Sequence, residues 1–427
     1  MNRAERSGIG RGPIEKTVFL KTGGPLQRPV SGQDGGSAEK TGFPEEQGPL
    51  QRPVFRKTGG PFRQRTKDLT GGTDGAGSMT KVGIIGFGYM GHFHLKKVLS
   101  CRDARVCAVF DTDEKKRAQA EEEGIQAFGS LDAFLGSELD LIVIATPNQW
   151  HAPYAIAAME AGKDVLCEKP AVLSVRELDE LAECSRRTGK FFTVHQQRRW
   201  DPDYRAVCDV VRSGEIGNVT TIESRVFGER GVCFGWRADP ESGGGMLYDW
   251  GVHLIDQILM LFEPLKVKSV YARILSVLTP AVDDFFEITM LLENGVCARI
   301  SVTTFALQKM PRWFVFGDRG TMKLNDFSGV VGGVARIREQ VKGFDSVVGQ
   351  KDLGPSRTMA PLHPDMLEAL PIPKEEDMQM EFWDNLLRAS RREEEPYVSL
   401  KQIRRQMQVV EAAFLSAREN RVVETEI

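Results

Sequence analysis

Short apolar runs alternate with longer amphipathic stretches from Lys81 to Gln196. The amphipathic stretches predict helices, as at 151–162 and 174–189. The apolar runs predict strands at 81–85, 104–111, 139–147, 163–170 and 190–196. Strands that alternate with helices at this spacing form a parallel sheet with helices on both faces. We therefore predict a doubly wound α/β domain over residues 79–200.

The pattern changes after residue 200, where apolar and polar residues alternate in longer runs with turn residues between them. These runs predict strands within 219–227, 266–275, 284–306 and 312–325. Residues 399–420 have the spacing of an amphipathic helix. The sequence thus predicts a second α/β domain over 201–427, whose final helix packs back on the first domain. Residues 327–380 are rich in Pro and Gly and predict an extended loop or an extra hairpin. Such a segment could shape the substrate pocket or form an oligomer contact.

Residues 1–78 have neither pattern. They contain 16 Gly and 7 Pro, and 13 Lys or Arg against 8 Asp or Glu. A segment that begins at Glu15 with EKTVFLKTGGPLQRPV recurs at Glu39 as EKTGFPEEQGPLQRPV. So few large apolar side chains cannot offset the entropy of ordering, and disorder is expected. Since MTKVGIIGFG at Met79 is typical of a natural start, our hypothesis is that the upstream residues are not part of the working protein. A functional basic tail is the alternative.

Composition limits the class of protein. The chain has 427 residues, 41% hydrophobic and 27% charged, with a formal net charge of -3, which gives no argument for binding nucleic acid or a membrane surface. We find no apolar run of about 20 residues and no signal-peptide core, so we expect a cytoplasmic protein. The seven cysteines are scattered without CxxC spacing, which is typical of reduced, buried thiols.

A glycine-rich turn follows the first predicted strand. Gly86-Phe87-Gly88-Tyr89-Met90-Gly91 fits GxGxxG, and an acidic residue, Asp111, ends the second strand. The first Gly permits a tight turn, the second lets a pyrophosphate approach the backbone, and the third allows close packing of helix and strand. We predict a dinucleotide site there. Asp111 favours NAD, because it would bind ribose hydroxyls and repel a 2'-phosphate, although it could equally be a helix N-cap. The basic run 115–117 leaves NADP possible.

Two further loops follow strands, and ligands of an open α/β sheet lie beyond the carboxyl ends of its strands. They are TPNQWH at 146–151 and CEKPAV at 167–172. Although a lysine is most often solvated, the position of Lys169 in such a loop favours a functional role. Beyond the glycine-rich turn and Asp111, the residues predicted to contact the cofactor are Thr146, Pro147, Asn148, His151, Glu168, Lys169 and Gln196.

Asp249 and His253 stand four residues apart after a run of three glycines. Apolar residues from Trp250 to Phe262 recur at helical spacing, so a helix begins near Asp249 and the pair shares one face. The structural alternative is that Asp249 complements the helix dipole and His253 is a buried core histidine. The glycines favour a site, because they allow the backbone to approach a ligand or another chain segment closely.

The succession GFGYMG, TPNQWH, EKP and GGGMLYDWGVHLID resembles the Gfo/Idh/MocA family of NAD(P)-dependent oxidoreductases, from Met79 to the C-terminus. The resemblance implies a Rossmann domain followed by an α/β domain with a large, mostly antiparallel open sheet. It also implies a homodimer or homotetramer formed through that sheet.

By this resemblance, the residues matching Lys169, Asp249 and His253 form a catalytic set. In oxidation of an alcohol, a histidine that titrates near neutrality is suited to accept the proton. Asp249 would orient the imidazole and Lys169 would hydrogen-bond the substrate oxygen. We therefore expect reversible oxidation of a secondary hydroxyl of a sugar, inositol or related polyol to a ketone. The alternatives are an NAD-dependent glycosidase with transient redox and a non-catalytic nucleotide-binding regulator.

Other residues are candidates for substrate contact. Arg198 or Arg199 could bind polyol hydroxyls or a carboxylate, or either could form a structural ion pair, and Trp236 with Arg237 could hold a sugar ring. The structural alternative for Trp236 is the filling of a domain interface. The predicted substrate-binding set is Lys169, Arg198, Trp236, Arg237, Asp249 and His253. His92 and His94 are expected to pack rather than to ligate, and no metal site is predicted.

Overall fold

The computed structural model describes residues 79–232, 235–341, 348–350, 354–356, 361–376 and 378–427. The predictions about residues 1–78 lie outside this part of the chain. Within it, two large sheets share a continuous cluster of buried hydrophobic side chains. None of the described helices is long and apolar enough to cross a membrane.

The first sheet has six parallel strands in the order β3-β2-β1-β4-β5-β6. The strands are β1 (Thr80–Ile85), β2 (Ala104–Phe110), β3 (Gln126–Phe128), β4 (Leu141–Ile144), β5 (Asp164–Cys167) and β6 (Phe192–Val194). The connecting helices are α1 (Tyr89–Leu99), α2 (Glu114–Glu122), α3 (Leu131–Leu135), α4 (His151–Glu160) and α5 (Val175–Thr188). The predicted parallel α/β architecture is confirmed. Its strand order reverses between β1 and β4, which leaves a crevice at the carboxyl ends of these strands.

Local sequence explains these elements. Every residue of β4 is buried, as expected for a strand with helices on both faces. Helix α5 begins where the Ser174 side chain accepts a hydrogen bond from the Glu177 amide, and it ends at Gly189, whose φ is 67°. Glycine adopts this left-handed conformation without a steric penalty, so the helix stops there.

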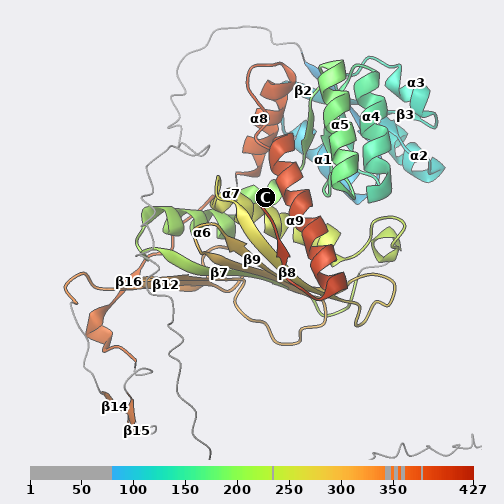
Figure 1. Cartoon of the computed structure of the whole chain (residues 1–427). Coiled ribbons are helices and arrows are strands. Elements are labelled where there is room, and N and C mark those ends of the chain that lie inside the picture. Colours follow the sequence, from blue (N-terminus) through green and yellow to red (C-terminus); the bar gives the residue numbers. More distant parts are fainter. Residues whose placement is uncertain (1–78, 233–234, 342–347, 351–353, 357–360, 377) are drawn as a thin grey trace, which may run out of the picture. The chain divides into compact units, whose positions relative to one another are not determined.

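The second sheet has nine strands in the order β16-β13-β12-β11-β7-β10-β9-β8-β17. Among the described strands of this sheet, only β7 and β10 pair in parallel, so the sheet is mostly antiparallel, as expected. Figure 1 shows helices α6, α7 and α9 on one side of it. The main elements are α6 (Pro202–Ser213), β7 (Val219–Phe227), α7 (Val252–Leu261), β8 (Val267–Leu275), β9 (Phe285–Leu292), β10 (Cys297–Thr303), β11 (Trp313–Gly317) and β12 (Gly320–Leu324).

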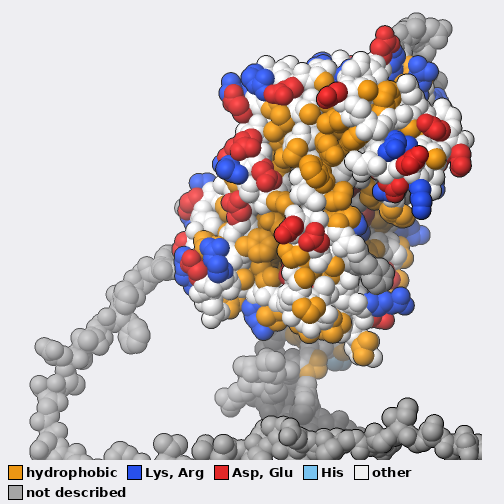
Figure 2. Space-filling view, turned by 90° about the vertical axis from the view of Figure 1, so that its right-hand side faces the viewer, with side chains coloured by type: hydrophobic (Ala, Val, Ile, Leu, Met, Phe, Trp, Pro, Cys, Tyr) orange, Lys and Arg blue, Asp and Glu red, His pale blue; other side chains and the backbone are white. Residues whose placement is uncertain are grey.

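Strand β9 shows how the two faces of this sheet differ. Phe286, Ile288, Met290 and Leu292 are buried, while the residues between them are half-buried or exposed. This alternation is typical of a sheet with one covered face. Figure 2 shows one side of the molecule, on which hydrophobic side chains gather toward the middle with a few acidic side chains among them, and most charged side chains lie toward the margin.

The segment from 327 to 380 extends the second sheet at one edge through β13 (Gly332–Ile337) and β16 (Leu367–Leu370). Strands β14 (Val348–Gln350) and β15 (Gly354–Ser356) form a separate antiparallel pair. Residues 342–347, 351–353, 357–360 and 377 of this segment lie outside the described part.

The C-terminal residues connect the two domains. Helix α8 (Gln379–Ser390) contacts α1, and α9 (Leu400–Glu419) contacts α5 and β6 of the first domain as well as α7 and β8 of the second. The chain ends with the short strand β17 (Val423–Glu424) beside β8. Both domains are therefore held to one another by segments distant in sequence.

Candidate active site

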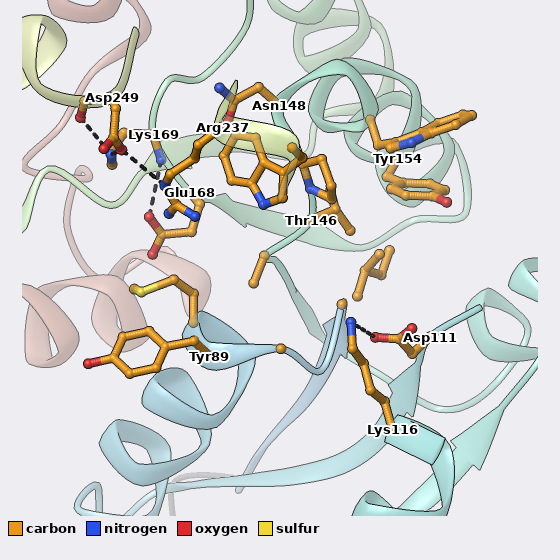
Figure 3. A pocket seen from close by; sticks show the side chains of 18 of the residues that line it. Tyr89, Asp111, Lys116, Thr146, Asn148, Tyr154, Glu168, Lys169, Arg237 and Asp249 are labelled. Atoms are coloured by element: carbon orange, nitrogen blue, oxygen red, sulfur yellow. Dashed lines mark hydrogen bonds and ion pairs between the residues drawn. The ribbon is translucent and has the colours of Figure 1, made fainter. Parts of the chain in front are cut away.

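A cavity of about 920 Å³ lies at the carboxyl ends of the first-domain strands and is lined by both domains. Figure 3 shows Asp111 and Lys116 at one end of it and Lys169, Arg237 and Asp249 at the other. The predicted site residues that line it are Gly86, Gly88, Tyr89, Met90, Asp111, Thr146, Pro147, Asn148, Glu168, Lys169, Arg198, Trp236, Arg237, Asp249 and His253. Four predicted residues, Phe87, Gly91, His151 and Gln196, are not among the lining residues.

The glycine-rich turn has the geometry that a pyrophosphate requires. Gly86 has a φ of 89°, and a Cβ on Gly91 would lie 2.3 Å from the Gly86 carbonyl oxygen. By contrast, a Cβ on Gly88 would meet no heavy atom closer than Lys116 Nζ at 3.9 Å. The first and third glycines therefore serve the turn and its packing, and the second leaves the backbone open to the cavity. Helix α1 has no side-chain cap, so its first N–H groups are available for phosphate oxygens.

Asp111 at the end of β2 is buried and already bound by backbone amides. Its carboxylate accepts hydrogen bonds from Phe87 N at 2.7 Å and Asp113 N at 2.9 Å. Lys116 Nζ lies 3.7 Å from the same carboxylate and lines the cavity. Arg117 instead donates to the backbone carbonyls of Asp111 and Thr112. Of the basic run, Lys116 is therefore the residue placed to meet a 2'-phosphate.

Two buried polar side chains hold the loops of the first domain against each other and against the second domain. The two ring nitrogens of His151 lie 2.7 Å from the Pro170 carbonyl oxygen and 3.0 Å from the Thr146 carbonyl oxygen, so the ring, which in its neutral form donates to one of them, sits between the loops after β5 and β4. Asn148 Nδ2 donates to the Gly243 carbonyl oxygen at 2.8 Å. His151, predicted as a cofactor contact, thus has both ring nitrogens occupied by the protein.

Glu168 is a buried carboxylate with two histidine partners. Its Oε1 accepts hydrogen bonds from His94 Nε2 at 2.7 Å and His195 Nδ1 at 2.9 Å. Burial by itself raises the pKa of Glu168, but His195 and His94 lower the pKa well below its ordinary value. In the described part of the chain, these three side chains are also the group whose spacing could hold a metal ion. Their direct hydrogen bonds satisfy Glu168 without one.

Lys169 and Asp249 form an ion pair between the two domains. Lys169 Nζ lies 2.6 Å from both Asp249 Oδ1 and the Asp249 carbonyl oxygen, and Arg237 Nε lies 3.5 Å from the same Oδ1 (Figure 3). Burial raises the pKa of the Asp249 carboxyl, but Lys169 and Arg237 outweigh it, so the pKa falls below its ordinary value. Asp249 is therefore ionised when it holds the lysine.

His253 is buried and is bonded to Gln196, not to Asp249. Its Nδ1 lies 3.0 Å from Gln196 Oε1. A carbonyl oxygen can only accept, so this contact puts the hydrogen on Nδ1 and leaves a lone pair on Nε2. Burial, followed by the charges of Lys169 and Arg198, lowers the pKa of His253 well below its ordinary value. The imidazole is therefore neutral at neutral pH, rather than titrating there as expected from sequence.

Asp249 does not orient His253, contrary to the sequence prediction, because its carboxylate is taken by Lys169 and Arg237. Residues Leu247–Gly251 form one π-helical turn, and α7 itself begins at Val252. The preceding glycines serve a close approach of chain segments, since a Cβ on Gly244 would lie 2.4 Å from the Arg237 carbonyl oxygen.

The structure separates two arginines that the sequence treats alike. Arg199 is buried and forms two 2.7 Å hydrogen bonds with Asp256, so it is a structural ion pair. Arg198 lines the cavity, bonds Asp201 at 2.8 Å, and lies 4.1 Å from the centre of the Trp250 ring.

Sequence reasoning missed three aromatic wall residues. Trp150 stacks on Tyr154, with ring centroids 5.7 Å apart, and Trp250 lines the other end beside the predicted Trp236. The spacing of Trp150 and Tyr154, four residues apart in the helix after TPN, is the signal that could have found them.

The fold and this cleft define an NAD(P)-binding oxidoreductase. Residues 80–196 match the "Oxidoreductase family, NAD-binding Rossmann fold" of GFO_IDH_MocA, and residues 204–323 match the GFO/IDH/MocA C-terminal domain. The chain belongs to the Gfo/Idh/MocA family, as the motifs predict.

Individual relatives agree with this assignment. An oxidoreductase of Rhizobium meliloti is 36% identical over 54% of this chain and 70% of that protein. The scyllo-inositol 2-dehydrogenase (NADP(+)) of Bacillus subtilis is 29% identical over 49% of this chain and 59% of that protein. The crystal structure of an NAD-binding protein from Listeria innocua is 34% identical, with a TM-score of 0.77 over 82% of this chain and 100% of that one.

The position of Lys116 makes a prediction about the cofactor. We expect Lys116→Ala to weaken NADPH binding roughly tenfold and NADH binding much less, because the lysine both meets a 2'-phosphate and offsets the charge of Asp111. Fluorescence titration with each dinucleotide measures this. Lys115→Ala is the matched control, since Lys115 is exposed and does not line the cavity. Equal weakening of both dinucleotides by Lys116→Ala would contradict the prediction.

Proposed function

We propose that this protein oxidises a secondary hydroxyl of a sugar, inositol or related polyol to a ketone by hydride transfer, reversibly. The observation that carries the proposal is the meeting of a neutral, buried imidazole and an ion-paired lysine at one end of the dinucleotide cleft. Bound NAD(P) supplies the hydride acceptor there. That relatives include inositol 2-dehydrogenases supports the substrate class.

His253 is the proposed base. Its Nε2 lone pair is available because Nδ1 donates to Gln196, and the lowered pKa keeps this nitrogen unprotonated at neutral pH. The proton of the substrate hydroxyl would pass to Nε2 as the hydride leaves carbon. Gln196 is then a positioning residue that fixes the tautomer.

Lys169 is the proposed donor to the reacting oxygen. Its ammonium group is held by Asp249 at 2.6 Å and lies on the cavity wall, so no reorganisation is needed to place its charge. An ammonium beside the alkoxide that develops during oxidation stabilises it. Asp249 serves the reaction by holding Lys169 rather than by touching His253.

Removal of the base tests the proposal. We expect His253→Ala to lower kcat about 10²- to 10⁴-fold with dinucleotide binding retained, as is general for loss of an acid–base group. The assay follows reduced nicotinamide with a panel of inositols, sugars, sugar acids and glycosides. His363→Ala is the control, because that histidine is exposed.

The same assay separates the alternatives. Cleavage of a glycoside without accumulation of NADH or NADPH supports a glycosidase with transient redox. Tight dinucleotide binding with neither reaction supports a regulator, and full activity of His253→Ala excludes the proposed base.

The pH dependence of kcat/KM tests the roles of His253 and Gln196. Because burial lowers the pKa of His253, the acid limb that reports its protonation should lie below about pH 6.5, the ordinary value for histidine. In Gln196→Glu, a carboxylate faces the imidazole, favours its protonated form and raises its pKa. The acid limb should therefore move to higher pH by about one unit. A limb that stays in place would mean that another group controls the rate.

We also infer that the uncovered face of the second sheet joins two copies of the chain. Exposed apolar side chains on this face include Tyr271, Leu291 and Phe316, which are 36%, 42% and 39% exposed. Burying such side chains drives association. Leu291→Glu should halve the mass measured by light scattering. Glu293→Gln, at an exposed charged site beyond the same strand, should not.

A further inference from the structure

Two arginines at the reacting end of the cavity have N–H groups without partners. Arg198 uses Nη1 for Asp201, and its buried Nε has no hydrogen-bond partner among the described residues. Arg237 makes one side-chain contact to an acceptor there, from Nε to Asp249 at 3.5 Å, and its two Nη groups have none in the described part of the chain. Most of the ten N–H donors of these two guanidinium groups thus remain for a ligand.

Aromatic rings hold both guanidinium groups in place. Arg198 lies 4.1 Å from the centre of the Trp250 ring and 5.3 Å from that of Phe327, and Arg237 lies 4.4 Å from that of Trp236. Stacking of this kind restricts the side chain before a ligand arrives, so less entropy is lost on binding.

Few acceptors are left for the cations at this end. Lys169, Arg198 and Arg237 all line the cavity; Asp249 is shared by the lysine and Arg237, and Asp201 binds one nitrogen of Arg198. The remaining carboxylate on the wall, Glu168, directs Oε1 at two histidines. An anionic group on the ligand would meet the N–H groups of Arg198 and Arg237 that these carboxylates leave without partners. The dinucleotide pyrophosphate does not, because the glycine-rich turn that fits it lies beside Asp111 at the opposite end (Figure 3).

We propose that the substrate carries a carboxylate, held by the Arg198 and Arg237 guanidinium groups, and is a sugar acid rather than a neutral sugar or inositol. Guanidinium groups match carboxylates in shape and charge and bind them with paired hydrogen bonds. This inference rests on the proposed function for the reaction but concerns a different part of the substrate. The hydroxyl that is oxidised would face Lys169 and His253, while the carboxylate lies on the arginine side.

Direct binding tests the inference without requiring turnover. Calorimetric titration of the NADH-loaded protein would compare hexuronates and aldonates with their neutral counterparts, such as glucuronate with glucose and galactonate with galactitol. We expect at least one acid to bind roughly tenfold or more tightly than its neutral counterpart, because a ligand that lacks the carboxylate leaves the arginine donors, the buried Arg198 Nε among them, unpaired. Equal binding within every pair, or binding of no acid, overturns the inference.

Variants locate the carboxylate. Arg237→Gln and Arg198→Gln should each weaken binding of the preferred acid at least tenfold and that of its neutral counterpart less, and Arg237→Lys should restore part of the loss. Arg102→Gln is the matched control, because that arginine is exposed and does not line the cavity. Loss of acid and neutral ligand to the same degree would assign the arginines a structural role and overturn the inference.

Failure of the two proposals can be told apart. If an acid binds tightly but NAD(P) is not reduced in its presence, the proposed oxidation is wrong while the substrate class stands. If neutral polyols are oxidised and acids are not preferred, the proposed reaction stands and the inference that the substrate carries a carboxylate is wrong.

Discussion

The ion pair between Lys169 and Asp249 is the contact on which the cleft depends. It joins the loop after β5 to the π-helical turn before α7, across 80 residues of sequence and across the two domains. A largely buried pair stabilises a structure only when its geometry is good and its remaining groups are bonded. Here the ammonium also donates to the Asp249 backbone carbonyl. Removing Asp249 would leave the Lys169 ammonium without its carboxylate, so the pair fixes the relative position of both loops.

Neighbouring polar contacts make the same junction rigid. Asn148 reaches the carbonyl of Gly243, and His151 ties the loops after β4 and β5 together. Gly244 and Gly245 leave no room for a Cβ against Arg237 and Asp283. The wall of the cavity is therefore assembled from hydrogen bonds between loops that are distant in sequence. Some buried polar atoms of its residues, Arg198 Nε among them, have no partner in the described part of the chain and are available to a ligand.

Much of this arrangement could be predicted from local sequence. The glycine-rich turn, Asp111 and the two loops after strands follow from patterns that span only a few residues, and the structure brings all of them to one cavity. Partners distant in the chain could not be predicted in this way. Gln196 is 57 residues from His253, and no spacing rule connects them. Likewise Arg198 and Arg199 are adjacent in sequence, yet Arg198 lines the cavity and Arg199 binds the buried carboxylate of Asp256.

The sequence by itself determined the parallel first domain, the dinucleotide turn and the identity of the polar groups, because hydrophobic period and glycine placement act over single elements. Only the tertiary structure decided how those groups are paired. Asp249 bonds Lys169 across the two domains and His253 bonds Gln196, and burial gives this histidine a pKa that its neighbours in sequence do not predict. Pairing and pKa depend on distance and desolvation in three dimensions, which a linear pattern does not contain.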